Sequence, residues 1–216
     1  MREYLEVGAQ FARDTDRHQM TVLRDDGLYR HLRFASNPLG YGEYWFDLVT
    51  WPGCLTVRGD AVDGYTFTRL PDMFEFFRAD RKWGINAHYW AEKADGGRES
   101  VKEYSEEAFR QLVCELFVDA VRYGDTPRGI GRAVREQILD RDLYDEREAH
   151  SLLESFEFKG FEFYDTWELS ARVYERSSLW ACHAIAWGIA RYDRVTRHGL
   201  SALAGVHPAA RKAVAA

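Results

Sequence analysis

The stretch YWFDLVTWPGCLTVRGD, residues 44–60, decides the fold. It consists of two apolar runs of strand length on either side of Trp51-Pro52-Gly53, a pattern typical of a β-hairpin. The loop is either Pro52-Gly53 or the four residues 51–54, whereas a three-residue loop would shift the register by one. Pro52 cannot take the positive φ that the commonest two-residue hairpin turns need at their first central position, so we favour the four-residue loop.

Both even-length loops give the same strand register. Asp47 then lies directly opposite Arg58 on one face of the hairpin, where opposite charges stabilise the pair by roughly 0.2–1 kcal/mol. The other face carries the apolar positions and is expected to face the core: Phe46, Leu48, Leu55 and Val57.

Further strands are predicted on both sides of this hairpin. Residues 19–34 turn over at Asp25-Asp26-Gly27, a strong hairpin signal, and Leu28, Leu32 and Phe34 alternate there with polar residues. Residues 35–42 form a loop, residues 59–64 a turn, and residues 65–69 a further strand. We predict an antiparallel meander of four to five strands with one buried face and one partly polar face.

Helices are predicted before and after the sheet from apolar spacing and from capping residues. The predicted helices are residues 1–18, 72–78, 105–123 with Ser105 as N-cap, 127–139 and 151–158; residues 84–93 stay ambiguous, and residues 140–150 are a charged helix or connector. Residues 161–167 are either a strand or an extended aromatic arm. Residues 168–197, which include Trp187, are apolar nearly all the way round, so we expect this helix in the interior, between the sheet and the other helices.

These elements predict an α+β fold: an antiparallel β-meander packed against helices, with a C-terminal helical region. We divide the chain into residues 1–93, with the first helix and the sheet, and residues 94–200, a helical region packing on that sheet in one compact domain. Residues 201–216 are small and Ala-rich, and we expect this tail to fray.

Charge and cysteine usage narrow the classes of function. The formal net charge is −6 without a stripe of Lys and Arg, which disfavours nucleic-acid binding. Three scattered cysteines are typical of reduced thiols in a cytosolic protein. We expect no signal peptide and no membrane span, because the longest apolar run is far shorter than about 20 residues. A cytoplasmic location is the expectation.

One group of residues is the candidate binding site. Tyr29, His31, Arg33, Asp47 and Arg58 are predicted to emerge together on the polar sheet face, flanked by Trp45 and Trp51. Two arginines with a histidine suit an anionic ligand or a partner protein. The alternative is a structural salt-bridge patch, because ion-pair networks gather the same residue types.

Four other patterns have a structural interpretation. His88 and Glu92 are spaced for a shared helix face but lack a third metal ligand. Gly129-Ile130-Gly131 marks a helix boundary rather than a phosphate loop. Cys182 and His183 are neighbours on a helix and point apart, so they do not form a nucleophile–base pair. The phenylalanines of residues 74–77 are either core residues, which we favour, or an exposed patch that binds a partner.

The segments RHLRF (30–34), YWFDLVTWPGCLTVRGD (44–60), YTFTRLPDMFEFF (65–77) and WACHAIAWGIARYD (180–193) together resemble an uncharacterised family encoded in bacteriophages and prophages. The resemblance covers the sheet and the last helix, but not residues 94–155. The family has a shorter turn than residues 59–64, and two adjacent cysteines where this chain has Ala181-Cys182. The resemblance implies a phage accessory protein made in the cytoplasm of an infected bacterium.

We therefore expect non-catalytic binding of a host or bacterial-defence protein, that is, a counter-defence inhibitor. The alternative is a small-molecule or nucleotide binder, or a nucleotide-processing enzyme, that uses the polar sheet face. Binding is favoured over catalysis, and no catalytic residue, metal or cofactor is expected.

Overall fold

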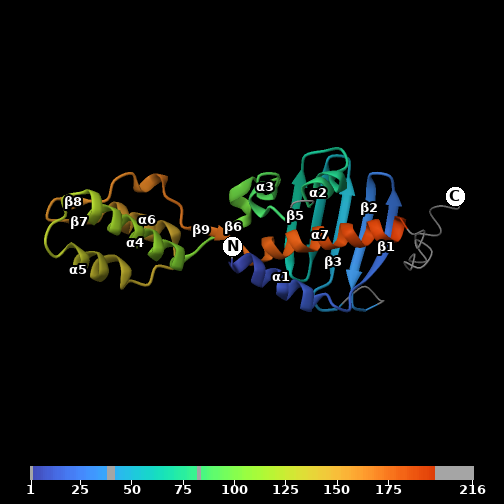
Figure 1. The fold of residues 1–216 in the computed structure, drawn as a ribbon, viewed down its shortest axis with the longest axis horizontal. Coiled ribbons are helices and arrows are strands. Elements are labelled where there is room, and N and C mark those ends of the chain that lie inside the picture. The colour runs from blue at the N-terminus through green and yellow to red at the C-terminus, as the bar shows by residue number, and fades with distance from the viewer. Residues whose placement is uncertain (1, 38–41, 82–83, 198–216) are drawn as a thin grey trace. The chain divides into compact units, whose positions relative to one another are not determined.

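A computed structural model of the chain describes residues 2–37, 42–81 and 84–197. The chain folds into a five-stranded antiparallel sheet with helices, as the α+β prediction requires (Figure 1). The strands follow one another in the order β1 (Gln19–Asp26), β2 (Tyr29–Ala35), β3 (Phe46–Trp51), β4 (Cys54–Gly59) and β5 (Val62–Thr68). The predicted tail 201–216 lies outside the described residues.

The central hairpin β3–β4 has the predicted register, but its loop is shorter than we favoured. Asp47 pairs with Arg58 and Trp51 with Cys54, so only Pro52 and Gly53 form the turn. Gly53 has φ 84°, which suits the second central position of a type II turn with proline at the first. The predicted four-residue loop is wrong. In a type II turn only the second central residue has a positive φ, so proline fits the first position of a two-residue loop.

Other predicted boundaries also move. β5 begins at Val62, so the turn before it is residues 60–61 rather than 59–64. The helix predicted at 151–158 runs instead as α6 (Glu146–Glu154), where Asp145 caps it by accepting hydrogen bonds from two backbone N–H groups. Its predicted last residues form a short strand, β7 (Glu157–Phe158).

The chain divides into two compact units. Unit 1 consists of residues 1–101 and 174–216, and unit 2 of residues 102–173. Within unit 1, the backbone N–H of Glu175 donates to the carbonyl of Val101 at 3.0 Å, so the chain leaves and re-enters this unit at adjacent points. The predicted boundary near residue 93 differs: the last helix belongs to the unit that contains the sheet.

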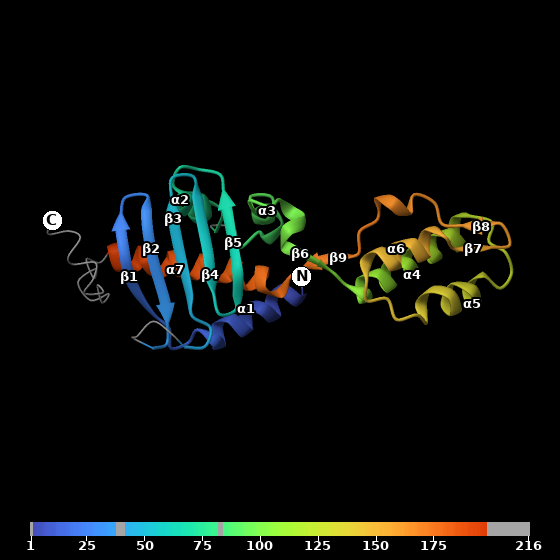
Figure 2. The ribbon, with the colours of Figure 1, turned by 180° about the vertical axis from the view of Figure 1, so that it is seen from behind.

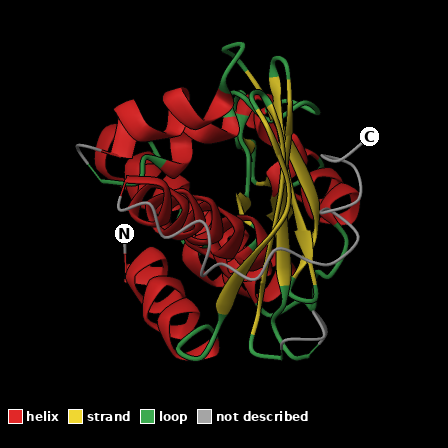
Figure 3. Ribbon diagram, turned by 90° about the vertical axis from the view of Figure 1, so that its right-hand side faces the viewer, coloured by secondary structure: helices red, strands yellow, loops and turns green. Residues whose placement is uncertain are grey.

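Unit 1 places its long helices on one face of the sheet (Figure 3). The helices are α1 (Arg2–Asp14), α2 (Met73–Arg81), α3 (Ala87–Ala91), the 3-10 turn η1 (Arg98–Val101) and α7 (Arg176–Arg197). Seen from behind, the strands lie in front of α7, and no described helix of unit 1 covers them there (Figure 2). The sheet therefore has one covered and one open face.

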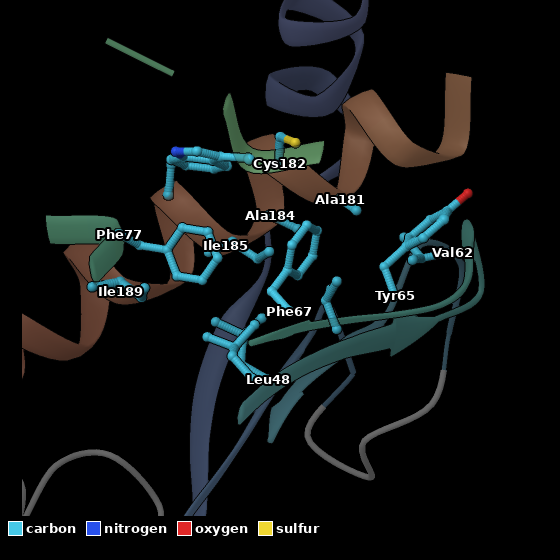
Figure 4. Packing of buried hydrophobic residues seen from close by; sticks show 14 of the residues in the cluster. Leu48, Val62, Tyr65, Phe67, Phe77, Ala181, Cys182, Ala184, Ile185 and Ile189 are labelled. Carbon is cyan, nitrogen blue, oxygen red and sulfur yellow. The ribbon is translucent and has the colours of Figure 1, made fainter. Parts of the chain in front are cut away.

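Helix α7 forms the centre of the covered side, as its apolar sequence predicts. Ile185 lies beside the sheet residue Phe67, and Ile189 lies near Phe77 of α2 (Figure 4); all four side chains are buried. A Cβ at Gly188 would lie 2.7 Å from a methyl carbon of Leu48, so glycine permits this close approach. Trp187 is only partly buried, although its ring packs edge-on against a core phenylalanine.

Unit 2 has a hydrophobic core of its own, formed by residues such as Phe109, Ile138 and Leu153. Its elements are β6 (Lys102–Tyr104), α4 (Glu106–Tyr123), α5 (Ile130–Val134), the π-helical turn η2 (Arg135–Leu139), α6, β7, β8 (Phe161–Glu162), η3 (Thr166–Glu168) and β9 (Arg172–Tyr174), whose last residue returns to unit 1. Ser105 caps α4, as predicted, by accepting a hydrogen bond from the backbone of Ala108.

Candidate functional site

The open sheet face brings together four of the five predicted site residues. β2 supplies His31 and Arg33, β3 supplies Asp47 and β4 supplies Arg58. Asp47 is directly opposite Arg33 on one side and Arg58 on the other. Successive side chains of a strand point to opposite faces, so these residues emerge opposite Leu32, Leu48 and Val57, which are fully buried on the covered face.

Asp47 is the centre of this group, and only 2% of it is exposed. Arg33 donates two hydrogen bonds of 2.8 Å, one to each carboxylate oxygen. His31 Nε2 lies 3.1 Å from Asp47 Oδ2 but is not well aligned for a hydrogen bond. Burial alone would raise the pKa of Asp47, yet the interactions with Arg33 and His31 outweigh it and hold this pKa below its usual value.

Arg58 has a different environment from the one its register suggests. Its side chain is exposed, and its guanidinium lies 5.7 Å from the centre of the Trp45 ring. The guanidinium of Arg33 lies over the same ring at 4.9 Å. The pairing between β4 and β5 shifts register here, because two residues of β5, Asp63 and Gly64, stand opposite the single residue Arg58. The predicted alignment of Asp47 with Arg58 is thus confirmed, while the bidentate pair forms with Arg33.

Tyr29 shares the open face but lies at the hairpin end of β2. It is 46% exposed, and its ring contacts Arg24 rather than the Asp47 cluster, with 5.2 Å from the guanidinium carbon to the ring centre. Trp51 is 38% exposed at the end of β3. The face therefore presents two exposed aromatic rings at its hairpin end, and an exposed cation, Arg58, beside the buried Asp47 carboxylate.

This arrangement suits recognition better than proton transfer. A general base needs a pKa near the operating pH, whereas Asp47 is held ionised and is occupied by Arg33. The exposed groups are Arg58, Trp51 and Tyr29, and His31 beside Asp47 is partly exposed. Arginine and aromatic side chains are the residue types enriched in protein interfaces.

A second bidentate ion pair, which was not predicted from the sequence, lies on the covered face of the sheet. Arg30 donates bidentate hydrogen bonds of 2.9 and 3.0 Å to Asp72, and its guanidinium lies 4.7 Å from the ring centre of Phe74. Asp72 also accepts from the backbone N–H of Phe74 at the start of α2. The available signal was the position of Arg30 between Leu28 and Leu32 in the strand alternation. This ion pair links the start of α2 to strand β2.

The remaining predicted patterns have the following surroundings. His88 Nε2 lies 4.0 Å from Glu92, whose carboxylate accepts a hydrogen bond from Arg98. Cys182 is buried, which raises the pKa of its thiol to about 12, while His183 stacks on Tyr4 with 4.7 Å between ring centres. The two side chains therefore lie in different environments.

Gly129 stands at the start of α5, as predicted, and the phenylalanines of residues 74–77 are buried, also as predicted. The described residues contain no group of three or more His, Cys, Asp or Glu side chains arranged to hold a metal ion. None of the described helices has the length and apolar character that a membrane crossing requires.

Two larger cavities lie away from the Asp47 cluster. One of about 610 Å³ is lined by residues of unit 2, from α4 and from residues 124–127 and 159–164. Another of about 480 Å³ lies in unit 1, and its lining includes three acidic residues, Asp63, Asp95 and Glu175. Comparisons with protein families, with curated proteins and with solved structures found no match for this chain.

Proposed function

We propose that the protein acts by non-catalytic binding of another protein through the open face of its sheet. The observation that carries this proposal is the state of Asp47, the buried carboxylate of the face, which Arg33 neutralises with two hydrogen bonds. With that carboxylate occupied, the exposed groups are Tyr29, Trp51 and Arg58, which are suited to contact rather than to chemistry, and the partly exposed His31 lies against Asp47.

The chemistry of the face defines the kind of partner surface. Trp51 and Tyr29 offer apolar rings, and the guanidinium of Arg58 is pre-positioned by stacking on Trp45. A complementary partner would present a carboxylate toward Arg58 and apolar side chains toward the rings. Truncation of such central aromatic and arginine residues typically costs about 2 kcal/mol or more of binding free energy.

The class of target comes from the resemblance of residues 30–34, 44–60, 65–77 and 180–193 to a family of phage and prophage proteins. We propose a host or bacterial-defence protein as the target, blocked by occupation of its surface in the bacterial cytoplasm. This role requires no cofactor and no catalytic group.

The proposal is tested by capture from infected cells followed by binding to the purified target. The double variant Trp51→Ala/Arg58→Ala should bind the target more than about tenfold more weakly than the unmodified protein. The matched control is Leu5→Ala/Arg17→Ala, which removes one exposed apolar side chain and one exposed cation from the first residues of the chain. Equal loss in both variants would contradict the proposal.

The small-molecule alternative makes a separate prediction. A nucleotide bound at the Arg33–Asp47–Arg58 face would stabilise the protein by about 2.7 kcal/mol at a hundredfold its dissociation constant. A thermal shift with a nucleotide panel that disappears in Arg58→Ala would favour this alternative over protein binding.

A further inference from the structure

The negative charge of the chain is concentrated in unit 2. Residues 102–173 contain 17 acidic and ten basic side chains, which gives a formal charge of −7. The chain as a whole carries −6, so that unit 1 carries a charge of +1. Any partner that docks on unit 2 meets an acidic field, which favours a basic surface and repels an acidic one.

Unit 2 also contains the cavity of about 610 Å³, a size typical of ligand pockets. Leu116 and Ala120 of α4 line it together with Phe161 and Phe163, all of them partly buried. These side chains make an apolar lining that accommodates a large hydrophobic group.

The rim of this cavity is acidic. Asp125 and Glu162 line the cavity and are both exposed, and among the described residues neither of them forms a salt bridge. Lys159, the one basic residue of the lining, donates its hydrogen bond to the carbonyl of Arg128 and lies 5.0 Å from the centre of the Phe158 ring. Two carboxylates are therefore available to a ligand while the lysine is engaged.

Exposed aromatic side chains accompany the cavity. Tyr164 lines it and is 77% exposed, and Tyr123, next to the lining residue Gly124, is 80% exposed. Exposed rings beside a hollow are typical of a surface that contacts another molecule.

We propose that this cavity is a docking site for a basic protein segment, which inserts one large apolar side chain between α4 and residues 159–164. Lysine or arginine residues that flank the inserted side chain pair with Asp125 and Glu162. The site is separate from the open sheet face, and its test does not depend on the function proposed for that face.

The charge of unit 2 also disfavours two other possible occupants of the cavity, nucleic acid and a second copy of the unit. Nucleic acid carries the same sign of charge as the rim and would be repelled. A second copy of unit 2 would bring −7 against −7. A basic peptide is the occupant whose charge complements both the rim and the unit.

The test uses the full chain and fluorescent pentapeptides in which tryptophan, phenylalanine or leucine stands between two pairs of arginines. Fluorescence anisotropy at about 0.15 M salt measures their affinity; at this ionic strength distant charges are largely screened. At least one of these peptides should bind with a dissociation constant below about 1 mM. Replacing the central residue by alanine, or the arginines by glutamates, should weaken binding about tenfold or more.

Two kinds of variant locate the site. Asp125→Asn/Glu162→Gln removes the rim charges from exposed positions, and Ala120→Phe fills the hollow; each should weaken binding about tenfold. The control Glu148→Gln/Glu154→Gln removes the same charge from exposed positions of α6 and should retain nearly full affinity.

Three results would overturn the proposal. These are the absence of binding by all three arginine peptides, equal weakening in the control variant, and binding of the glutamate peptide as tightly as the arginine peptide. Because the charge variants change only exposed side chains, they keep the test informative even where Ala120→Phe fails to fold.

Discussion

At the residue scale, Asp47 has an arginine opposite it on each neighbouring strand and forms its bidentate ion pair with only one of them. The strand register places one arginine on each side of it, and β-sheet geometry alone does not choose between them. Arg33 forms the bidentate pair, whereas Arg58 lies at a register shift and stacks on Trp45. Alternation in the sequence predicted that the three share a face, but which arginine pairs with Asp47 depends on side-chain packing, for which the sequence carries no clear signal.

A double-mutant cycle measures this choice. Arg33→Ala should cost about 3–5 kcal/mol, because it leaves the buried Asp47 carboxylate without its partner. The coupling energy between Arg33 and Asp47 should exceed that between Arg58 and Asp47. Chemical denaturation of the single and double alanine variants gives both values. Equal coupling of Asp47 to the two arginines would contradict the structure.

Arg30 illustrates a different limit of sequence reasoning. Its position in the strand alternation points to the covered face, but its charge argues for solvent. The structure resolves the conflict with Asp72, which is 42 residues away in the sequence and pairs with Arg30 in a bidentate manner. A long-range pair of this kind follows from the packing of α2 on the sheet, which one sequence does not reveal.

At the element scale, α7 is the helix on which unit 1 is assembled. Its apolar sequence was enough to predict an interior helix, and Ala184 and Ile185 are fully buried. The exposure of part of Trp187 was not predictable, because a helix that is apolar all round does not show which side its neighbours leave uncovered.

Gly188→Ala tests the close approach of α7 to the sheet. The added Cβ would lie 2.7 Å from Leu48 Cδ1 and 3.1 Å from Phe34 Cζ, so helix and sheet must separate. We expect a loss of about 1–3 kcal/mol in the free energy of unfolding, despite the higher helix propensity of alanine. Arg194→Ala, at an exposed position of the same helix, is the control and should change stability by less than about 0.5 kcal/mol. A Gly188→Ala variant as stable as this control would refute the close packing.

Two histidines lie near helix α1, one packed against it and one just beyond its end. His183 of α7 stacks on Tyr4 and Phe11, and its Nε2 is buried without a hydrogen-bond partner. His18, beyond the end of α1, is bonded through Nε2 to the Tyr44 carbonyl at 3.0 Å. Burial lowers the pKa of both histidines below the ordinary 6.5, although carbonyl groups near both and Asp14 and Asp16 near His18 favour the charged form.

A pH dependence follows from these lowered values. The unfolded chain takes up a proton at each histidine below about pH 6.5, and the folded chain only at a lower pH, so stability is full above 6.5 and falls as the pH drops. The loss is at most about 1.4 kcal/mol per pH unit for each histidine. Thermal unfolding between pH 7.5 and 5 should show a shallower slope for His18→Gln/His183→Gln. An unchanged slope would assign the acid sensitivity to other groups.

At the scale of the whole molecule, the chain consists of a sheet unit interrupted by a helical unit. The sheet unit was predictable because its hairpins carry turn signals and strict alternation. The insertion was harder to predict, since its ends at residues 101 and 174 are adjacent in space but far apart in the sequence, and each unit has its own core. The cavity of unit 2 also escaped prediction, because its lining comes from segments about 40 residues apart in the sequence.

Replacing residues 102–173 with a short glycine-rich linker tests this organisation. The core of unit 1 contains only residues of unit 1, and the bond from Glu175 to Val101 brings the cut ends together. We expect the shortened chain to unfold cooperatively, with the near-UV circular dichroism of packed tryptophans. A chain that lacks a cooperative transition would mean that unit 1 depends on unit 2 for its fold.

Binding of a protein by the open sheet face, as proposed above, can be tested by site-specific photocrosslinking in infected bacteria. A photoreactive phenylalanine analogue at Trp51, an exposed position of that face, should give one dominant adduct, while the same analogue at Leu5 of α1 should not. The Trp51 adduct should disappear when Arg58→Glu is added. No adduct from Trp51, or equal adducts from both positions, would contradict the claim.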